Sequence, residues 1–309
     1  MAPRCKWCGS PAFIWLEYAR IAFCKKHFID YFLRKVERTV KSYGLVEMGD
    51  RILVALSGGK DSASMFFALA RLFSDVATLI PVTIDLGGEH PFFADYVEKV
   101  RKQCSLLGFE AKVVRLEEYG FTIDDIFRAQ PITGRPICSA CALVKRYILN
   151  DVARKLGANK IALGHVLDDM AAYIMLNLIS GDLHALSKLG PSSPARDALP
   201  ARIRPLYEVY ELETKALCEA AGIPYAGEDC PYSKGEKLGP FKDVMRQLER
   251  NRPASLLTFA RNFAKKLLPL IKVEEAPLKK CSVCGAPTSS EVCAFCRLKA
   301  AVLKAKSKA

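Results

Sequence analysis

Short apolar runs alternate with longer amphipathic segments along the middle of the chain. Apolar runs at residues 51–57, 78–85, 110–116 and 160–164 predict four buried strands. Segments with helical periodicity predict helices at residues 62–73, 95–107, 141–156, 168–179, 211–221 and 254–268. This alternation predicts an α/β fold built on a doubly wound parallel sheet.

Both ends of the chain depart from this pattern. Residues 1–30 predict a small module held together by metal, and residues 31–43 predict a basic amphipathic helix. Residues 187–204 are rich in Ser, Pro and Arg and predict an exposed loop, and a short linker at 273–277 precedes a second small module. We therefore expect an N-terminal module with its helix at 1–43, a catalytic domain at 44–278 and a C-terminal module with a basic tail at 279–309.

The net charge of +13 is concentrated at the two ends. Residues 1–43 hold nine Lys and Arg against three acids, and residues 279–309 hold seven against one, so the long middle is almost neutral. Basic ends on a neutral body predict two arms that hold a polyanion, although a solvated basic surface is the simpler alternative. We expect no transmembrane span and no signal peptide, and therefore a cytoplasmic protein.

Seven of the twelve cysteines and one histidine form two sets of four metal-ligand candidates. Cytosolic thiols stay reduced, so disulfides are not expected. The N-terminal set is a C-x2-C followed by a C-x2-H, and the C-terminal set is C-x2-C-x8-C-x2-C. Each set supplies four soft ligands and predicts one structural Zn²⁺. The ligands are Cys5, Cys8, Cys24 and His27 for the first zinc, and Cys281, Cys284, Cys293 and Cys296 for the second.

Three other cysteines lack a matching pair. Cys138 and Cys141 form a C-x2-C, and Cys230 could approach them through the fold. Three thiolates suit a [4Fe–4S] cluster with one iron left open, and a redox pair or buried structural thiols are the alternatives. Cys104 and Cys218 have apolar neighbours and predict small buried side chains, although either could supply a fourth sulfur.

A glycine pair separates the first predicted strand from its helix. Backbone N–H groups and a helix N-terminus there would bind phosphate oxygens, Lys60 would neutralise charge and Asp61 could hold Mg²⁺. The alternative is an ordinary turn between a strand and a helix. The glycine pair belongs to the string SGGKDS, which comprises Ser57, Gly58, Gly59, Lys60, Asp61 and Ser62. This string resembles the pyrophosphate loop of the PP-loop ATPases, which bind ATP.

Residues after other predicted strands are further candidates for the ATP site. Asp85 follows the second strand and could border the adenosine, or else cap a helix or turn. Gly164 and His165 end the fourth strand, where sites of doubly wound folds form. His90 predicts a surface residue of a loop.

The order of these motifs is similar to that of the TtuA/TtcA family of tRNA 2-thiolation enzymes, and both zinc modules favour its TtuA branch or the related wobble-uridine enzymes. The similarity covers nearly the whole chain. It rests on both sets of zinc ligands and on five further motifs. These are Lys26-His27-Phe28, the string SGGKDS, Arg135-Pro136-Ile137-Cys138-Ser139-Ala140-Cys141 with Lys145-Arg146-Tyr147, Gly164-His165-Val166-Leu167-Asp168-Asp169, and Glu228-Asp229-Cys230-Pro231-Tyr232.

The resemblance implies a mechanism. ATP would adenylate the C2 oxygen of a tRNA uridine, with release of pyrophosphate, and the T-loop uridine is the expected target. Cys138, Cys141 and Cys230 would hold a [4Fe–4S] cluster whose open iron carries the attacking sulfide. A ubiquitin-like carrier protein with a C-terminal thiocarboxylate would supply sulfur. Lys145 and Asp169 match positions implicated in catalysis together with Asp61, and a homodimer is usual.

One position departs from the family pattern. Met170 stands where a glutamate is usual, so the arrangement of metal ligands here could differ, with Asp169 covering the role. The competing functions are wobble-uridine thiolation by the same chemistry, a PP-loop ligase that transfers no sulfur, and an RNA-binding zinc-ribbon protein with an inactive ATP fold.

Overall fold

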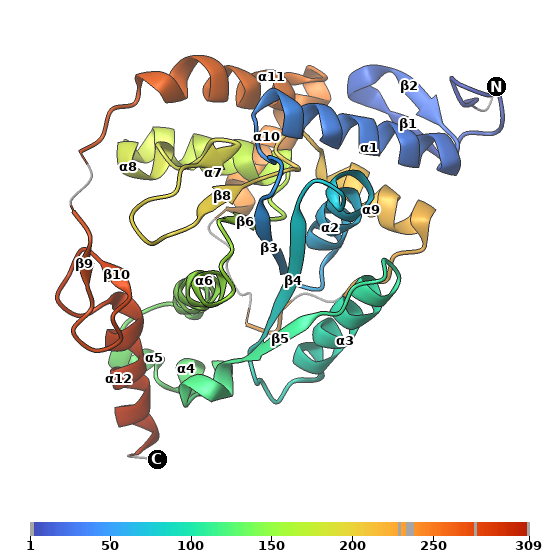
Figure 1. The fold of residues 1–309 in the computed structure, drawn as a ribbon. Coiled ribbons are helices and arrows are strands. Elements are labelled where there is room, and N and C mark those ends of the chain that lie inside the picture. The colour runs from blue at the N-terminus through green and yellow to red at the C-terminus, as the bar shows by residue number, and fades with distance from the viewer. Residues whose placement is uncertain (1–2, 228–229, 233–237, 275–276, 308–309) are drawn as a thin grey trace.

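The computed structural model describes residues 3–227, 230–232, 238–274 and 277–307. Its centre is a six-stranded sheet with the strand order β5-β4-β3-β6-β8-β7 (Figure 1). All neighbouring strands are parallel except the last pair, β8 and β7. The strands are β3 Arg51–Leu56, β4 Thr78–Asp85, β5 Lys112–Arg115, β6 Lys160–Ala162, β7 Ser192–Ser193 and β8 Ala201–Ile203.

Helices cover both faces of this sheet. Ile52 and Val54 of β3 pack into the apolar cluster that contains α1, α2 and α9, while Leu53 packs into the cluster that contains α4, α6 and α12. Successive residues of a strand point to opposite faces, so a strand buried on both sides is apolar throughout. The helices are α1 Lys25–Ser42, α2 Lys60–Phe73, α3 Pro91–Ser105, α4 Ile123–Arg128, α5 Gln130–Thr133, α6 Ile137–Lys155, α7 Leu167–Ser180, α8 Leu183–Leu186, α9 Glu211–Ala221, α10 Gly239–Asn251, α11 Ser255–Asn262 and α12 Ala294–Lys306.

The predicted α/β fold with its parallel sheet is confirmed. Three helices begin at least four residues earlier than the periodicity indicated: α1 starts at Lys25, α6 at Ile137 and α3 at Pro91. The second difference matters for function, because it places both Cys138 and Cys141 in the first turns of α6. Among the residues described, no helix combines the length and the apolar character needed to cross a membrane.

The prediction of an exposed loop over 187–204 is wrong in part. Residues Ala201–Ile203 form β8, which pairs with β6 in the main sheet. Arg204 follows it and is buried, and its guanidinium donates to the carbonyls of Gly190 at 2.6 Å and Lys188 at 3.0 Å. An arginine in the sequence normally indicates an exposed position, so this composition predicted a loop. An arginine can be buried only where acceptors such as backbone carbonyls form hydrogen bonds with it, and the sequence does not reveal those acceptors. Helix α10 was not predicted either.

The two terminal modules lie on opposite sides of the sheet (Figure 1). The N-terminal one contains the hairpin of β1 Ile14–Leu16 and β2 Ile21–Phe23, and α1 connects it to α9. The C-terminal one contains β9 Lys279–Lys280 and β10 Pro287–Thr288, and its helix α12 packs on α4, α5 and α6. Residues 275–276 of the predicted linker lie outside the described residues.

Candidate nucleotide site and metal centres

The predicted phosphate loop joins β3 to α2. Gly58 has φ +81°, and a Cβ there would lie 2.7 Å from the Cβ of Tyr96, so both the conformation and the space require glycine. The Ser57 N–H donates to the Ser62 hydroxyl at 3.1 Å, and that hydroxyl donates to the Gly59 carbonyl at 3.1 Å. Gly59 is the N-cap of α2, so the N-terminus of this helix faces the loop. The loop has the form of an anion site.

Gly164 closes the other side of the loop. A Cβ on Gly164 would lie 2.9 Å from both the N and the Cα of Ser62. The end of β6 therefore packs directly on the first turn of α2. Close packing explains why a glycine stands at position 164, and contact of Gly164 with ATP stays a prediction.

Charged side chains surround the loop. The Lys60 ammonium lies 2.8 Å from a Glu211 carboxylate oxygen and 3.3 Å from Asp61. Thr214 donates its hydroxyl to Asp61 at 2.5 Å. Burial raises the pKa of Asp61, and the nearby Asp169 raises it further, while Lys60 and Thr214 oppose this. Burial lowers the pKa of Lys60, but Asp61 and Glu211 outweigh it, so the lysine stays protonated.

The first turn of α7 adds two carboxylates. Asp168 accepts a hydrogen bond from the Glu211 N–H at 2.7 Å, and burial raises the pKa of Asp168 to about 6. Asp169 pairs with Lys242 of α10 at 2.6 Å. Met170, where the resemblance led us to expect a glutamate, is buried in the apolar cluster of α7, α10 and α11 and points away from these charges.

His165 lies just before α7. Burial and the nearby Arg204 lower the pKa of His165 to about 4, so the ring is neutral at pH 7. Its Nδ1 is buried and has no hydrogen-bond partner within the part of the chain that the structure describes. Asp85 accepts from the Gly87 N–H at 3.0 Å, which is the turn role considered above. His90 is exposed at the N-cap of α3, as predicted for a surface residue.

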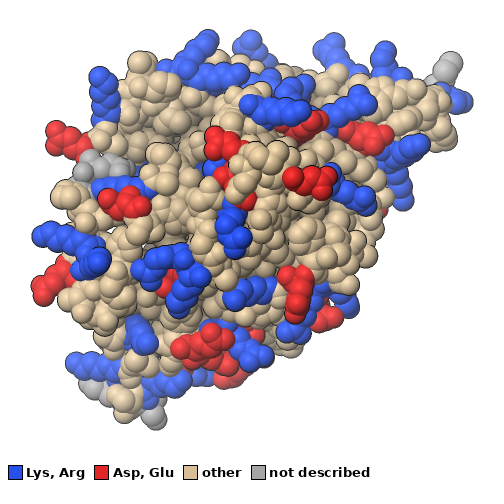
Figure 2. All heavy atoms as spheres, viewed as in Figure 1, with Lys and Arg blue, Asp and Glu red and all other residues tan. Residues whose placement is uncertain are grey.

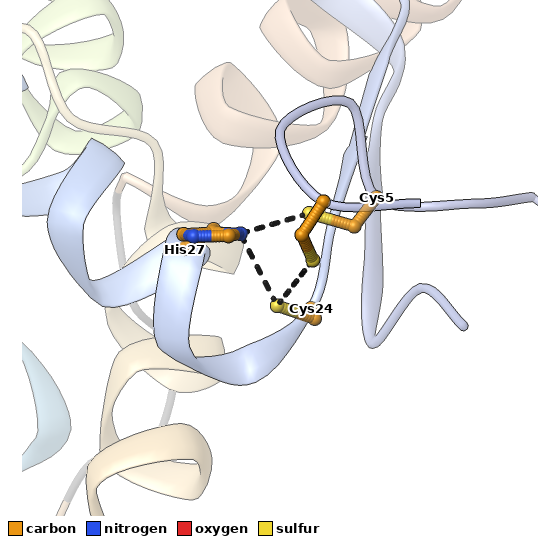
Figure 3. A group of neighbouring side chains, drawn as sticks. Cys5, Cys24 and His27 are labelled. Carbon is orange, nitrogen blue, oxygen red and sulfur yellow. Dashed lines mark hydrogen bonds between the residues drawn. The ribbon is translucent and has the colours of Figure 1, made fainter. Parts of the chain in front are cut away.

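Both terminal sets of metal ligands are assembled. In each set the four ligand atoms lie within 4.8 Å of one another. In the N-terminal set the Nδ1 of His27 lies 3.3 Å from the Cys5 sulfur and 3.6 Å from the Cys24 sulfur (Figure 3). Burial opposes ionisation of Cys5, but backbone N–H groups and His27 lower its pKa to about 5. The donor sets, three thiolates with one imidazole and four thiolates, fit Zn²⁺.

In the C-terminal set, two thiols accept hydrogen bonds from the backbone, and that of Cys293 does so from the Cys296 N–H at 3.4 Å. The Cys293 N–H lies 3.2 Å from the sulfur of Cys281. That bond is the main reason why the pKa of Cys281 falls to about 6. A thiolate is the form that binds a metal, so this site favours the ligand state that zinc requires.

Cys138, Cys141 and Cys230 belong to one region of the fold but do not form a tight set of ligands. In the described residues, only the two terminal sets bring three or more ligand atoms within 4.8 Å. The Cys138 sulfur lies 3.8 Å from the Tyr232 carbonyl, two residues after Cys230. Cys141 and Cys230 pack against the same apolar cluster. A cluster of four irons and four sulfides is larger than one ion, so wider spacing of these sulfurs fits it.

Tyr232 anchors the segment that carries Cys230. Its hydroxyl donates to Asp124 of α4, and its ring lies 4.8 Å from that of Phe127. Glu228 and Asp229, which precede Cys230 in the motif, lie outside the described residues. Lys145 is exposed on α6, one turn beyond Cys141, so both side chains project from the same side of the helix.

Two contacts connect these cysteines with the phosphate loop. The Gly58 carbonyl accepts from the Ala226 N–H at 3.0 Å, and Cys230 follows four residues later, within about 14 Å of chain. Tyr96, which packs on Gly58, has a raised pKa, first because of burial, then because of the nearby Asp85, and also because of the thiols of Cys141 and Cys230. Cys141 and Cys230 therefore lie near the loop, and a single site that joins the loop to all three cysteines stays a prediction.

Sequence reasoning missed several residues of this site. Glu211 and Thr214 of α9 contact the loop, Lys242 of α10 pairs with Asp169, and Tyr96 packs on Gly58 of the loop. The acidic first turn of α9 was visible as a helix start, but no spacing in the sequence connects it to a loop about 150 residues earlier. Cys104 and Cys218 are buried, as predicted, in the cluster of α1, α2 and α9.

Comparison with known proteins agrees with this geometry. Residues 30–233 match the family model of the PP-loop domain, and residues 4–29 match that of the N-terminal LIM domain of the 2-thiouridine synthetase TtuA. The chain is 37% identical to the tRNA-5-methyluridine(54) 2-sulfurtransferase of Pyrococcus horikoshii, over 95% of this chain and 93% of that one. It is 38% identical to the enzyme of the same name from Thermus thermophilus, over 98% of this chain and 93% of that one.

A solved structure is also similar throughout. The U34-tRNA thiolase NcsA from Methanococcus maripaludis, solved with its [4Fe–4S] cluster, superposes with a TM-score of 0.80 at 31% identity. The match covers 96% of this chain and 95% of that one.

Proposed function

We propose that this chain, which belongs to the PP-loop family of tRNA 2-sulfurtransferases, uses ATP to activate the C2 oxygen of a tRNA uridine and then replaces that oxygen with sulfur. The observation that carries the proposal is the contact between the two halves of the site. The phosphate loop is hydrogen-bonded to the segment that leads to Cys230, and Tyr96 packs on Gly58 of the loop and lies near Cys141 and Cys230. A nucleotide and a sulfur donor would therefore meet there.

In the first step the phosphate loop would bind ATP. The N–H groups at the start of α2 face the phosphates, Lys60 offsets their charge and Asp61 holds Mg²⁺. The uridine C2 oxygen attacks the α-phosphorus, and the bond to the β-phosphate breaks, so pyrophosphate leaves. The C2 oxygen is then part of an AMP ester, which is a good leaving group.

In the second step sulfur would attack C2 and displace AMP. Cys138, Cys141 and Cys230 would hold a [4Fe–4S] cluster, which supplies the site for sulfide when bound. Asp169 and Lys145 are the proposed catalytic partners of Asp61. The neutral His165 ring, which follows Gly164 after β6, would line the site and help to exclude water from the activated base. The sulfur would come from the thiocarboxylate of a ubiquitin-like carrier protein.

The proposed target is uridine 54 of the T-loop. Two relatives at 37% and 38% identity carry that position in their names. The structural neighbour at 31% identity acts on U34, so the wobble uridine is the second candidate. Mass spectrometry of tRNA fragments from a deletion strain would show which position loses its 2-thio group.

The chemistry is tested with protein purified without oxygen. We expect about four irons per chain, pyrophosphate release that depends on ATP and tRNA, and thiolated tRNA when a sulfur donor is present. Cys230→Ser should lose iron and thiolation but keep pyrophosphate release, and Asp61→Ala should lose both activities. A PP-loop ligase without sulfur chemistry would need no iron, and an inactive RNA-binding protein would release no pyrophosphate.

Assembly and tRNA contacts complete the proposal. The two zinc modules would hold tRNA through their basic side chains, and the enzyme would act as a homodimer. The division into parts at 1–43, 44–278 and 279–309 stays a prediction. Sedimentation of the purified protein, alone and with tRNA, would test the dimer.

A further inference from the structure

The first turn of α9 contacts both charged side chains of the phosphate loop. Glu211 binds Lys60 at 2.8 Å, and Thr214 donates to Asp61 at 2.5 Å. We propose that Glu211 and Thr214 are positioning residues, which orient Lys60 and Asp61 for ATP and its Mg²⁺. This inference rests on the proposed function, because it takes Lys60 and Asp61 to be the groups that meet the phosphates and the metal.

Lys60 needs a partner to hold one position. A lysine side chain is long and flexible, and its ammonium has no preferred direction of approach. Glu211 gives it a fixed acceptor, and Arg246 holds the second oxygen of the same carboxylate at 2.9 Å. A carboxylate held from both sides keeps its place when a phosphate approaches Lys60, so the ammonium stays at the mouth of the loop.

Asp61 is oriented in the same way. It accepts the Thr214 hydroxyl with one oxygen and faces Lys60 with the other. The Thr214 hydroxyl also lies 2.8 Å from the Glu211 carbonyl, so its position is defined by the backbone of α9. A carboxylate with one oxygen fixed presents the other in a defined direction, which is what a metal with strict geometry requires.

The turn that carries these residues is itself held firmly. The Glu211 N–H donates to Asp168, and the Tyr210 N–H donates to Glu213 at 2.8 Å. Glu213 is fully buried and pairs with the buried Lys35 of α1 at 2.6 Å. The first turn of α9 is therefore anchored to α7 and to α1, and it transmits that rigidity to the loop.

The experiment measures pyrophosphate release at saturating ATP and tRNA, together with the melting temperature. Glu211→Gln keeps the size of the side chain and removes its charge, and we expect the maximal rate to fall about tenfold while the melting temperature stays near that of the wild type. Asp243→Asn is the matched control, since it removes an exposed carboxylate that lies 3.5 Å from the same Arg246, and it should change neither quantity.

Thr214→Val tests the second contact separately. It removes the hydroxyl at constant size, and we expect the Mg²⁺ concentration for half-maximal rate to rise several-fold, with recovery in Thr214→Ser. An unchanged or higher rate in Glu211→Gln would overturn the proposal, because it would mean that Glu211 competes with the phosphates or has no role. A lower melting temperature with an unchanged rate would also overturn it, because the role would then be structural.

The outcome can be separated from the fate of the proposed function. If the wild-type protein releases no pyrophosphate with ATP and tRNA, the proposed function itself fails. If the wild type is active, Asp61→Ala is inactive and both α9 variants behave like the wild type, only the positioning role fails.

Discussion

The absence of a side chain at Gly164 allows the backbone there to pack directly on Ser62 of the phosphate loop. A Cβ there would lie 2.9 Å from Ser62 backbone atoms, which cannot move without moving the start of α2. We expect Gly164→Ala to abolish pyrophosphate release and to lower the free energy of unfolding by about 1–3 kcal/mol. Gly239→Ala is the control, because nothing lies within 4 Å of its Cβ position at the start of α10. Wild-type activity in Gly164→Ala would contradict this account.

Cysteine reactivity is a second property set by single residues. Burial raises the pKa of Cys104 to about 12 and that of Cys218 to about 11, whereas Cys138 is exposed. At pH 8 only about one in a thousand Cys218 side chains is then a thiolate. In iron-free protein we expect iodoacetamide to label Cys138 and to spare Cys104 and Cys218, as read by peptide mass spectrometry. Labelling in urea is the control, and rapid labelling of native Cys218 would disprove its burial.

At the scale of elements, α12 connects the C-terminal metal site to the helix of the cluster cysteines. Phe295 of α12 stacks on Tyr147 of α6 with ring centroids 3.7 Å apart. We expect Phe295→Ala to lower the free energy of unfolding by about 3 kcal/mol and to reduce the iron retained by anaerobic protein, because α6 loses its support. Val283→Ala, at a side chain 68% exposed in the same module, should change neither quantity. Equal urea midpoints for both variants would refute the connection.

The elements also show what the sequence could predict. The strands β3 and β4 are apolar on both faces, and the glycine pair marks the turn after β3, so the centre of the fold and the phosphate loop were predictable. Strand β8 was not, because Arg202 within it and Arg204 just after it look like loop residues until the backbone carbonyls that accept hydrogen bonds from Arg204 are known. The contacts of Glu211 and Thr214 were also out of reach, since they join residues about 150 positions apart.

At the scale of the whole molecule, the basic ends lie far apart. The N-terminal module and α1 occupy one edge, where Lys and Arg side chains gather, and the C-terminal module occupies the opposite side (Figures 1 and 2). The two predicted arms would therefore contact a tRNA at two distant places. Deleting residues 279–309 is a poor test of this idea, because Phe295, Leu298 and Val302 are buried against the catalytic domain.

Neutralising exposed charges tests the idea without exposing the core. Lys279, Lys280 and Lys304 are exposed on the C-terminal module. We expect their triple replacement by Gln to weaken tRNA binding and to flatten its dependence on salt. The slope of log K against log salt becomes shallower by about 0.9 for each duplex phosphate that the protein no longer neutralises. ATP binding should not change, because the helix of this module packs on α4, α5 and α6.

The matched control for this prediction replaces Lys99, Arg101 and Lys102 of α3 by Gln, which removes the same charge from another part of the surface. A specific arm for tRNA requires that the variant of the C-terminal module lose more affinity and more salt dependence than the α3 variant. Both quantities come from the same titration of labelled tRNA at several salt concentrations. If the two triple variants lose affinity and slope equally, the C-terminal module provides only general attraction for a polyanion.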